Sequence, residues 1–280
     1  MRKGLLISAC AAAAALVVAG CGGGGGNALQ SVAGAATKTV GQNSAKFHLD
    51  LAETVGPIGP LRFSADGVSD LTSHSADMTM DLSSVASLAG QAAGSPDQWK
   101  AHVILDGSGA SPVLYLRLPA LDQYLNGKTW VKADLASLAQ QSGVNLQQLF
   151  QEAANQDPTK ALQMLQSIGN VTKVGTATID GVNTTEYSGT IDVKKVAALL
   201  GPAESKALDQ AKITSIPVDV WIGDDGLVRR VHENFTYPAN GVQTTTDLTV
   251  DLSGFGTKVT VTPPPADQTA DISALKGIGA

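Results

Sequence analysis

Residues 218–237, VDVWIGDDGLVRRVHENFTY, decide the fold class of this 280-residue chain. Apolar residues in 218–222 and again in 231–237 follow a period of two, the pattern of strands with one buried and one solvated face. Asp224-Asp225-Gly226 lies between these runs and favours a tight turn. Alternation resumes in 242–252, so the whole stretch predicts an antiparallel meander.

The same alternation occurs several times earlier in the chain. Apolar runs of this kind lie at Phe47–Leu51, Leu61–Ala65, Met78–Leu82, Val103–Leu105 and Leu114–Leu118. Turn signals separate the runs at Gly56-Pro57, Asp66-Gly67, Asp106-Gly107 and Asn126-Gly127. The sequence therefore predicts a long series of strands, each with one buried face.

Other strands are predicted from shorter signals. A brief strand is expected at 129–132, and a last one around Val259 and Val261. Two threonine-rich runs, 172–179 and 182–191, flank Asp180-Gly181 and predict a tight hairpin. Because these two runs are poor in large apolar groups, we expect the hairpin at an edge of the sheet.

Helical spacing interrupts the strand pattern. A first helix is predicted over Ala28–Val40, with its apolar stripe at Leu29, Val32, Ala33 and Ala36. Residues 84–93 predict a short helix or loop, and further helices are expected to start near Asp134, Asn145, Asp157, Asp192 and Glu204. Gly169 is expected to end the helix that follows Asp157.

These elements together predict an α+β fold. A long sheet twists and therefore curls, so we expect a large curved, mostly antiparallel sheet with helices packed on its concave face, an open half-barrel. No repeat of fixed period and no linker occur within 45–262, which favours a single domain over 41–262. The proline-rich residues 263–280 are expected to form a partly ordered tail.

Composition limits the function. The chain is 43% apolar and 16% charged, which suits a globular domain with a core. The formal net charge of −6 argues against nucleic-acid binding, because little positive charge is available to neutralise phosphates. Two cysteines are too few for a disulfide-rich scaffold or a cysteine-built zinc site.

Residues 1–20 predict a lipoprotein signal peptide. Arg2 and Lys3 precede a short apolar run, Leu5–Val18, that is too short for a permanent membrane span. The run closes in Val18-Ala19-Gly20-Cys21, which resembles a bacterial lipobox, where a small-residue pair precedes a cysteine that receives diacylglycerol and further acyl chains. The alternative is an ordinary secretory signal with an incidental cysteine.

Processing at Cys21 would change the mature chain. Cys10 would leave with the signal peptide and Cys21 would carry lipid, so neither a free thiol nor a disulfide would remain. Loss of Arg2 and Lys3 would change the formal net charge from −6 to −8. Residues 22–27, GGGGGN, predict a flexible tether, and about nine residues of such chain give a reach of about 15–18 Å. We therefore expect a lipid-anchored protein on the extracytoplasmic face of the cell membrane.

Three motifs carry a family resemblance. They are GKTWVK at 127–132, VGTATIDGV leading to YSGT within 174–190, and VDVWIGDDGLVRR at 218–230. In this order, behind a lipobox, they resemble the actinobacterial LppX/LprG-type (LppX_LprAFG) lipoproteins, which have the LolA-like half-barrel fold. The resemblance implies non-covalent carriage of acylated lipids or glycolipids in a cavity between sheet and helices. It implies no catalytic residues.

Inward-facing residues of the predicted strands are the candidates for lipid contact. They are Phe47, Leu49, Phe63, Met78, Met80, Val103, Leu105, Leu114, Leu116, Val220, Val231 and Phe235. The alternative is a filled core built from the same side chains, because periodicity does not distinguish a packed core from a hollow one. Arg229 and Arg230 are expected to pair on the surface near Glu233 rather than to bind an anionic headgroup.

The sequence favours a protein that is not an enzyme. It has no Gly-x-Ser-x-Gly motif, and the histidines His48, His74, His102 and His232 lack metal-ligand spacing. No cofactor or metal is therefore expected. Two functions remain: a monomeric lipid carrier, with an envelope transporter as a possible partner, or a non-catalytic interaction module with a filled core that uses the threonine-rich hairpin as its exposed edge.

Overall fold

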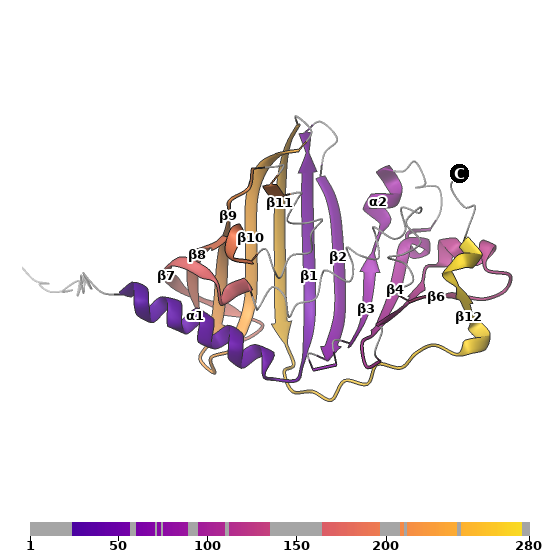
Figure 1. Ribbon diagram of the computed structural model, residues 1–280, viewed down its shortest axis with the longest axis horizontal. Coiled ribbons are helices and arrows are strands. Elements are labelled where there is room, and N and C mark those ends of the chain that lie inside the picture. Colours follow the sequence, from indigo (N-terminus) through magenta and orange to yellow (C-terminus); the bar gives the residue numbers. More distant parts are fainter. Residues whose placement is uncertain are drawn as a thin grey trace, which may run out of the picture.

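The described strands form one twelve-stranded sheet (Figure 1). The computed structural model describes residues 24–56, 60–70, 72–73, 75–88, 95–109, 112–134, 164–196, 208–209, 212–239 and 242–275. The strand order is β12-β6-β5-β4-β3-β2-β1-β11-β10-β9-β8-β7. Every pair is antiparallel except β12–β6, which is parallel. The predicted class, α+β with a large, mostly antiparallel sheet, is confirmed.

The strands of the first half are β1 (Ser44–Val55), β2 (Pro60–Asp70), β3 (Ser75–Asp81), β4 (Lys100–Asp106), β5 (Val113–Arg117) and β6 (Trp130–Asp134). The second half contains β7 (Ile168–Ile179), β8 (Val182–Asp192), β9 (Ser215–Gly223), β10 (Val228–Ala239), β11 (Val242–Ser253) and β12 (Thr269–Asp271). The two halves meet at the centre of the sheet, where β1 pairs with β11.

The described helices are α1 (Gly24–Val40), α2 (Ser83–Leu88) and α6 (Val193–Val196), with 3-10 turns η2 (Pro96–Trp99), η3 (Pro119–Tyr124), η4 (Ala266–Gln268) and η5 (Ile272–Leu275). Asp192 begins α6 as predicted, because its carboxylate accepts a hydrogen bond from the amide of Lys194 at 2.9 Å. In the described ranges no helix combines the length and hydropathy that a membrane span requires.

Helix α1 crosses the β7–β10 part of the sheet (Figure 1). Its buried stripe, Ala28, Val32, Ala35, Ala36 and Thr39, follows helical spacing and packs into one core with the strands. Thr39 fixes the end of the helix: its hydroxyl donates to the carbonyl of Ala35 at 2.7 Å and accepts from the amide of Val228 at 2.9 Å. α1 is therefore joined to the first residue of β10.

Two predictions for the first helix are wrong. The helix begins at Gly24, so residues 24–27 are helical rather than a flexible tether. Leu29, predicted to face the core, is exposed, and Ala28 and Ala35 are buried in its place. The helix therefore contacts the sheet mostly through small side chains, which allow a close approach.

The Asp66-Gly67 turn prediction is also wrong, since both residues lie within β2. Gly67 opposes Phe47 across β1 and β2. A Cβ atom on Gly67 would lie 2.8 Å from the Phe47 ring and 2.6 Å from the carbonyl oxygen of Asp77. The glycine therefore provides space for an aromatic ring rather than a turn.

At the C-terminal end, the predicted strand at 259–261 is absent, because residues 258–261 have no regular structure. The segment expected to be a partly ordered tail supplies β12 instead, which pairs with β6 through Ala270 and Val131. Ala270 and Leu275 are buried against Leu125 and Val131. The sheet therefore extends past Thr262, the predicted end of the domain.

The threonine-rich hairpin is confirmed. Asp180 and Gly181 have φ angles of 49° and 77°, as a tight hairpin turn requires, and β7 is an edge strand. Gly169 belongs to β7 and is not the helix end that was predicted. The predicted signal peptide, Cys21, and most of the helices expected after Asp134, Asn145, Asp157 and Glu204 lie outside the described residues.

Candidate functional site

One face of the sheet is apolar across nearly its whole width. Residues directly opposite each other in antiparallel strands share a face, so the register defines this surface. Leu49 opposes Val250 of β11 and Ala65 of β2, and Val250 opposes Val231 of β10. We call the face that carries Leu49 and its register partners the apolar face, and the opposite one the outer face.

All twelve residues predicted to contact lipid lie on the apolar face. Nine are fully buried, and Phe63, Leu105 and Phe235 are half-buried. The strand period of two carried this prediction, because β1 to β5 and β9 to β11 keep their alternation. Contact with a ligand stays a prediction.

Burial divides the apolar face into two zones. Phe47, Leu49, Val250 and Leu252, in the rows nearest the start of β1, are 3–7% exposed. In the next row, Leu51, Leu248 and Phe63 are all half-buried. Large apolar side chains therefore remain partly exposed toward the end of β1. Leu51 and Leu248 are additions to the predicted set, and the period of two could have found them.

Polar groups also lie in the half-buried zone. The hydroxyl of Tyr237 donates to Oε1 of Glu53 at 2.9 Å, and burial together with this carboxylate raises the pKa of Tyr237. The ring of Tyr237 stacks on Phe235 with centroids 5.7 Å apart. Glu233 shares the face, because it opposes Leu248, and loss of solvent around its carboxyl raises its pKa to about 7.

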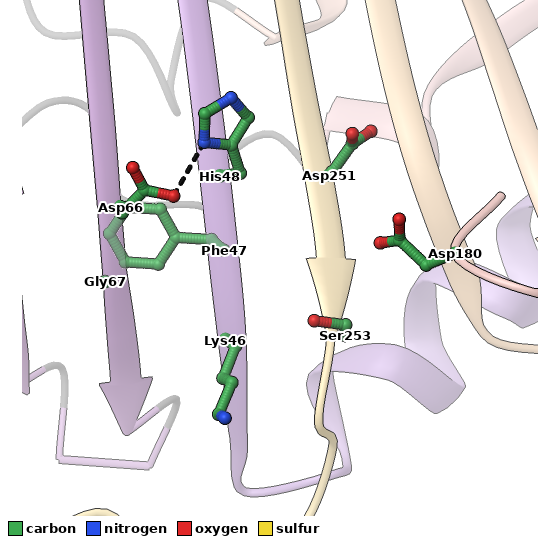
Figure 2. A pocket seen from close by; sticks show the side chains of 8 residues that line it. All are labelled: Lys46, Phe47, His48, Asp66, Gly67, Asp180, Asp251 and Ser253. Carbon is green, nitrogen blue, oxygen red and sulfur yellow. Dashed lines mark hydrogen bonds and ion pairs between the residues drawn. The ribbon is translucent and has the colours of Figure 1, made fainter.

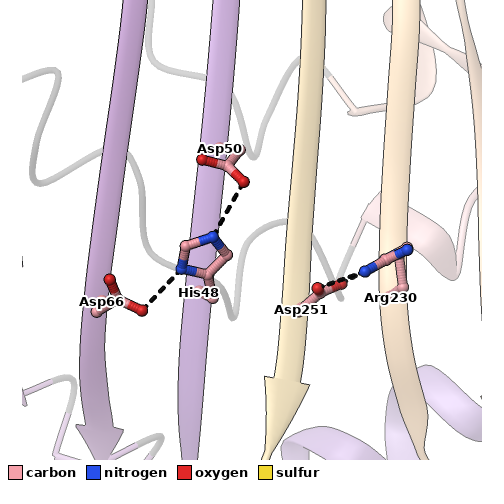
Figure 3. Close-up of polar contacts among 5 residues, drawn as sticks. All are labelled: His48, Asp50, Asp66, Arg230 and Asp251. Atoms are coloured by element: carbon pink, nitrogen blue, oxygen red, sulfur yellow. Dashed lines mark hydrogen bonds and ion pairs between the residues drawn. The ribbon is translucent and has the colours of Figure 1, made fainter. Parts of the chain in front are cut away.

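The outer face carries paired charges instead. His48 lies between Asp66, 2.7 Å from its Nδ1, and Asp50, 3.0 Å from its Nε2 (Figure 3). The hydrogen bond to Asp66, with help from Asp50, raises the pKa of His48 despite partial burial. Arg230 contacts both carboxylate oxygens of Asp251 (Figure 3). In these pairs, each charged side chain has a partner of opposite charge on its own strand or on a neighbouring one.

The arginine prediction is partly wrong. Arg230 pairs with Asp251, and Arg229 pairs with Asp225 and lies 4.8 Å from the centroid of the Phe255 ring. Both arginines form surface pairs as expected, but Glu233 is not their partner. The side chain of Glu233 belongs to the opposite face, as the alternation along β10 requires.

An open pocket of about 360 Å³ lies largely on the outer face (Figure 2). Its lining comes from β1, β2, β11 and the β7–β8 turn, and consists of Lys46, Phe47, His48, Asp66, Gly67, Asp180, Asp251 and Ser253. Three aspartates line this pocket together with Lys46 and His48. Its charged character does not suit acyl chains.

A second open pocket, of about 410 Å³, lies between α1 and the strands β8 and β9. Ala35, Tyr187 and Ile222 give it an apolar side, while Lys38 and Asp224 give it a charged rim. Neither pocket is lined by Leu51, Phe63, Leu248 or Phe235. The acyl-chain cavity that the resemblance implies therefore stays a prediction.

The histidines and tryptophans contribute to packing and surface pairs in the described ranges. Nε2 of His102 is hydrogen-bonded to the carboxylate of Asp77 at 2.7 Å, and the ring of His102 lies 5.0 Å from the buried Trp130 ring, centroid to centroid. His232 lies between Asp219 and Asp247. Within the described residues, no group of three or more potential ligands could hold a metal ion. His74 lies outside them.

Comparison with known proteins gives a family match. The family model described as "LppX_LprAFG lipoprotein" matches residues 122–261. An uncharacterized 31.2 kDa protein from the rplA–rplJ intergenic region of Streptomyces griseus is 26% identical over 156 residues, covering 53% of this chain and 50% of that protein. The chain spans about half the length of the curated relatives it matches.

Two solved structures are similar over most of the chain. The lipoprotein LppX of Mycobacterium tuberculosis is 18% identical with a TM-score of 0.46, covering 85% of this chain and 99% of that one. LprF from Mycobacterium bovis is 15% identical with a TM-score of 0.41, covering 86% of this chain and 98% of that one.

Proposed function

Because the chain belongs to the LppX_LprAFG lipoprotein family, we propose that it binds acylated lipids or glycolipids non-covalently and carries them in the cell envelope. The bound acyl chains lie on the apolar face of the sheet. The protein acts as a binding module without catalysis. A lipid is its ligand, and an envelope transporter is a possible protein partner.

The half-buried zone of the apolar face is the observation that supports lipid binding. Leu51, Phe63, Leu248 and Phe235 belong to four adjacent strands and are all partly exposed. Covering such surface yields about 25 cal/mol for each Å² of apolar area removed from water. An acyl chain can supply this cover, because it is flexible, apolar and long enough to cross several strands spaced about 4.8 Å apart.

The membrane anchor is the second part of the proposal. Acyl chains on Cys21 hold the mature chain on the extracytoplasmic face of the membrane, after removal of residues 1–20. One chain alone gives marginal binding, whereas two or more give a stable anchor. The domain would then work beside the bilayer that supplies or accepts its lipid.

The test is recovery of lipid from the full chain exported by an actinobacterial host. Organic extraction followed by mass spectrometry would identify the non-covalent lipid and its stoichiometry. The variant Leu51→Gln/Leu248→Gln places two polar groups on the half-buried zone. Ala52→Gln/Thr249→Gln is the matched control, because these neighbours on the same strands lie on the outer face.

We expect about one lipid per protein in the wild type and in the control, and a several-fold loss in the Leu51→Gln/Leu248→Gln protein. Circular dichroism and thermal melting would show whether each variant is folded. Equal lipid content in both double variants would contradict binding on the apolar face. A folded wild-type protein that takes up no lipid, even from vesicles, would contradict the function.

A second candidate function, a non-catalytic interaction module of the envelope, is supported by the edge of the sheet. Strand β7 lies at one edge of the sheet, and Val174 within it is 57% exposed. Unpaired backbone groups at such an edge can pair with an extended segment of another protein. This candidate predicts a folded protein without lipid.

A further inference from the structure

Glu233 interrupts the half-buried zone of the apolar face. It opposes Leu248, which opposes Leu51, which in turn opposes Phe63. The carboxyl group therefore ends a row of three partly exposed apolar side chains on four adjacent strands. An acyl chain lying across this row would bring its polar end, or a polar group along it, to Glu233.

The Glu233 carboxyl has no hydrogen-bond or ion-pair partner in the part of the chain that the structure describes. The cations closest in sequence are engaged elsewhere: Arg229 with Asp225, Arg230 with Asp251, and His232 with Asp219 and Asp247. A carboxyl in apolar surroundings without a partner costs folding free energy. Such a cost is typical of groups whose partner arrives with a ligand.

Further polar groups follow Glu233 along the same face. The hydroxyl of Tyr237 donates to Glu53 at 2.9 Å. Thr244, which opposes Tyr237, is 1% exposed, and its hydroxyl has no hydrogen-bond partner among the residues that the structure describes. We call Glu53, Glu233, Tyr237 and Thr244 the polar cluster, in which Glu233 is separated from Tyr237 and Thr244 along the strands by the position of Phe235. It has two carboxyl groups, two hydroxyl groups and no cation.

The composition of the polar cluster restricts its ligand. Two carboxyl groups without a cation repel phosphate and carboxylate groups, and the low polarity around them strengthens that repulsion. A carboxyl whose pKa is raised to about 7 both donates and accepts hydrogen bonds at neutral pH. A hydroxyl group has the same dual capacity and carries no charge to desolvate, so it is the matching partner.

We propose that Glu233 and the polar cluster form a hydrogen-bonding subsite that selects lipids with an uncharged hydroxyl group next to their acyl chains and rejects lipids with an anionic group there. This subsite rests on the proposed function. Glu233 supplies the direct hydrogen bond. The Tyr237–Glu53 pair, backed by the stacked ring of Phe235, fixes the polar end of the site.

The test is a competition between three matched lipids. The full chain with Cys21→Ala, which carries no covalent acyl chain, is incubated with vesicles that contain equal amounts of 1,2-dioleoylglycerol, its 3-acetyl ester and dioleoyl phosphatidic acid. The protein is separated from the vesicles, and its bound lipids are measured by mass spectrometry. The three probes share their acyl chains and differ only at the third glycerol oxygen.

The wild-type protein is expected to bind about tenfold more 1,2-dioleoylglycerol than its acetyl ester. This ratio corresponds to the free energy of one hydrogen bond to a charged or partly charged group. Phosphatidic acid should be the least abundant bound lipid. Glu233→Leu should keep the total bound lipid and lower the hydroxyl preference to about one. Glu233→Gln, which keeps hydrogen bonding without charge, should admit more phosphatidic acid.

Glu186→Leu is the control, because Glu186 is half-buried in the same sheet but precedes Tyr187, which opposes Val220 on the apolar face. It should leave the lipid ratios unchanged. Equal uptake of the hydroxyl and acetyl lipids by the wild type, or an unchanged preference in Glu233→Leu, would overturn the subsite while leaving lipid binding intact. If no lipid is taken up by any folded protein, the proposed function itself fails.

Discussion

Gly67 and Glu233 each depart from the alternation of apolar and polar residues, for different reasons. Gly67 lies on the apolar face and gives up its side chain to make room for the ring of Phe47. Glu233 lies on the same face and puts a carboxyl group where Val231 and Phe235 put apolar groups. The departure at Gly67 concerns the volume of a side chain, so an added methyl group should test it. The departure at Glu233 concerns the charge of a carboxyl group, so a change of pH should test it.

Gly67→Ala should lower the free energy of unfolding by roughly 2 kcal/mol, because the new methyl group would meet a backbone oxygen and an aromatic ring in a packed region. Gly175→Ala is the control, since a Cβ there would meet nothing within 4 Å. Urea unfolding of both proteins measures the difference. Equal midpoints would show that the sheet relaxes around the added methyl group.

The raised pKa of Glu233 makes stability depend on pH. Its folded-state pKa of about 7 exceeds the ordinary value of 4.5, so folding favours the protonated form. Stability from this group is fully present below pH 4.5 and is lost as pH rises through 7. The total loss is about 3 kcal/mol at 1.36 kcal/mol for each pKa unit.

Glu233→Gln should therefore be more stable than the wild type at pH 8, by about 2–3 kcal/mol, and closer to it at pH 5. Urea titrations of both proteins at these two pH values provide the measurement. The same gap at pH 5 and pH 8 would mean that Glu233 titrates at its ordinary value.

At the scale of elements, α1 and β10 depend on each other. The Thr39 hydroxyl accepts from the amide of Val228, both residues are 0% exposed, and the contact joins positions far apart in sequence. Thr39→Val keeps the shape of the side chain but leaves that amide without a partner, which should cost about 1–3 kcal/mol.

Thr37→Val is the matched control for Thr39→Val, because the exposed Thr37 hydroxyl only donates to the carbonyl of Ala33 in its own helix. Thermal unfolding should separate the two variants by several degrees. If they melt together, a water molecule replaces the Thr39 hydroxyl at the Val228 amide.

Helices and strands were predictable from the sequence wherever the spacing of apolar residues within the element matches the face that the element buries. The alternating runs of β1, β10 and β11 could be read directly, because each strand buries one face. Strand β12 could not be read, since three residues carry no period and their partner β6 lies far back in the chain. The start of α1 at Gly24 was missed because glycine has a poor helix propensity, so a glycine run does not predict a helix.

The candidate site was predictable to the same extent. The alternation of side chains along a strand placed Phe47, Leu49 and Val231 on one face. The same alternation places Glu233 on that face, between Val231 and Phe235. The charge of Glu233 instead suggested a surface pair with Arg229 or Arg230. Whether the face is hollow could not be predicted, because a packed face and a ligand-binding face have the same period.

At the scale of the whole molecule, the proposed acyl anchor on Cys21 would determine where the apolar face operates. Cys21→Ala should abolish incorporation of labelled palmitate and move the protein from the membrane fraction to the soluble fraction, because the acyl chains supply the membrane affinity. Arg230→Lys, on the outer face, should leave both readouts unchanged. Retention of palmitate in Cys21→Ala would assign the lipid to another residue.

The central pair β1–β11 has a kinetic consequence. Its partners, such as Phe47 and Leu252, are about two hundred residues apart, whereas most other strand pairs join near neighbours in sequence. The pair has a high contact order, because its partners are far apart in the sequence. Closing so long a loop costs conformational entropy before the contacts between the strands form. The two halves can each form their hairpins early, but the sheet becomes continuous only once the chain is nearly complete. The joining of β1 to β11 is therefore the step that we expect to limit the rate of folding.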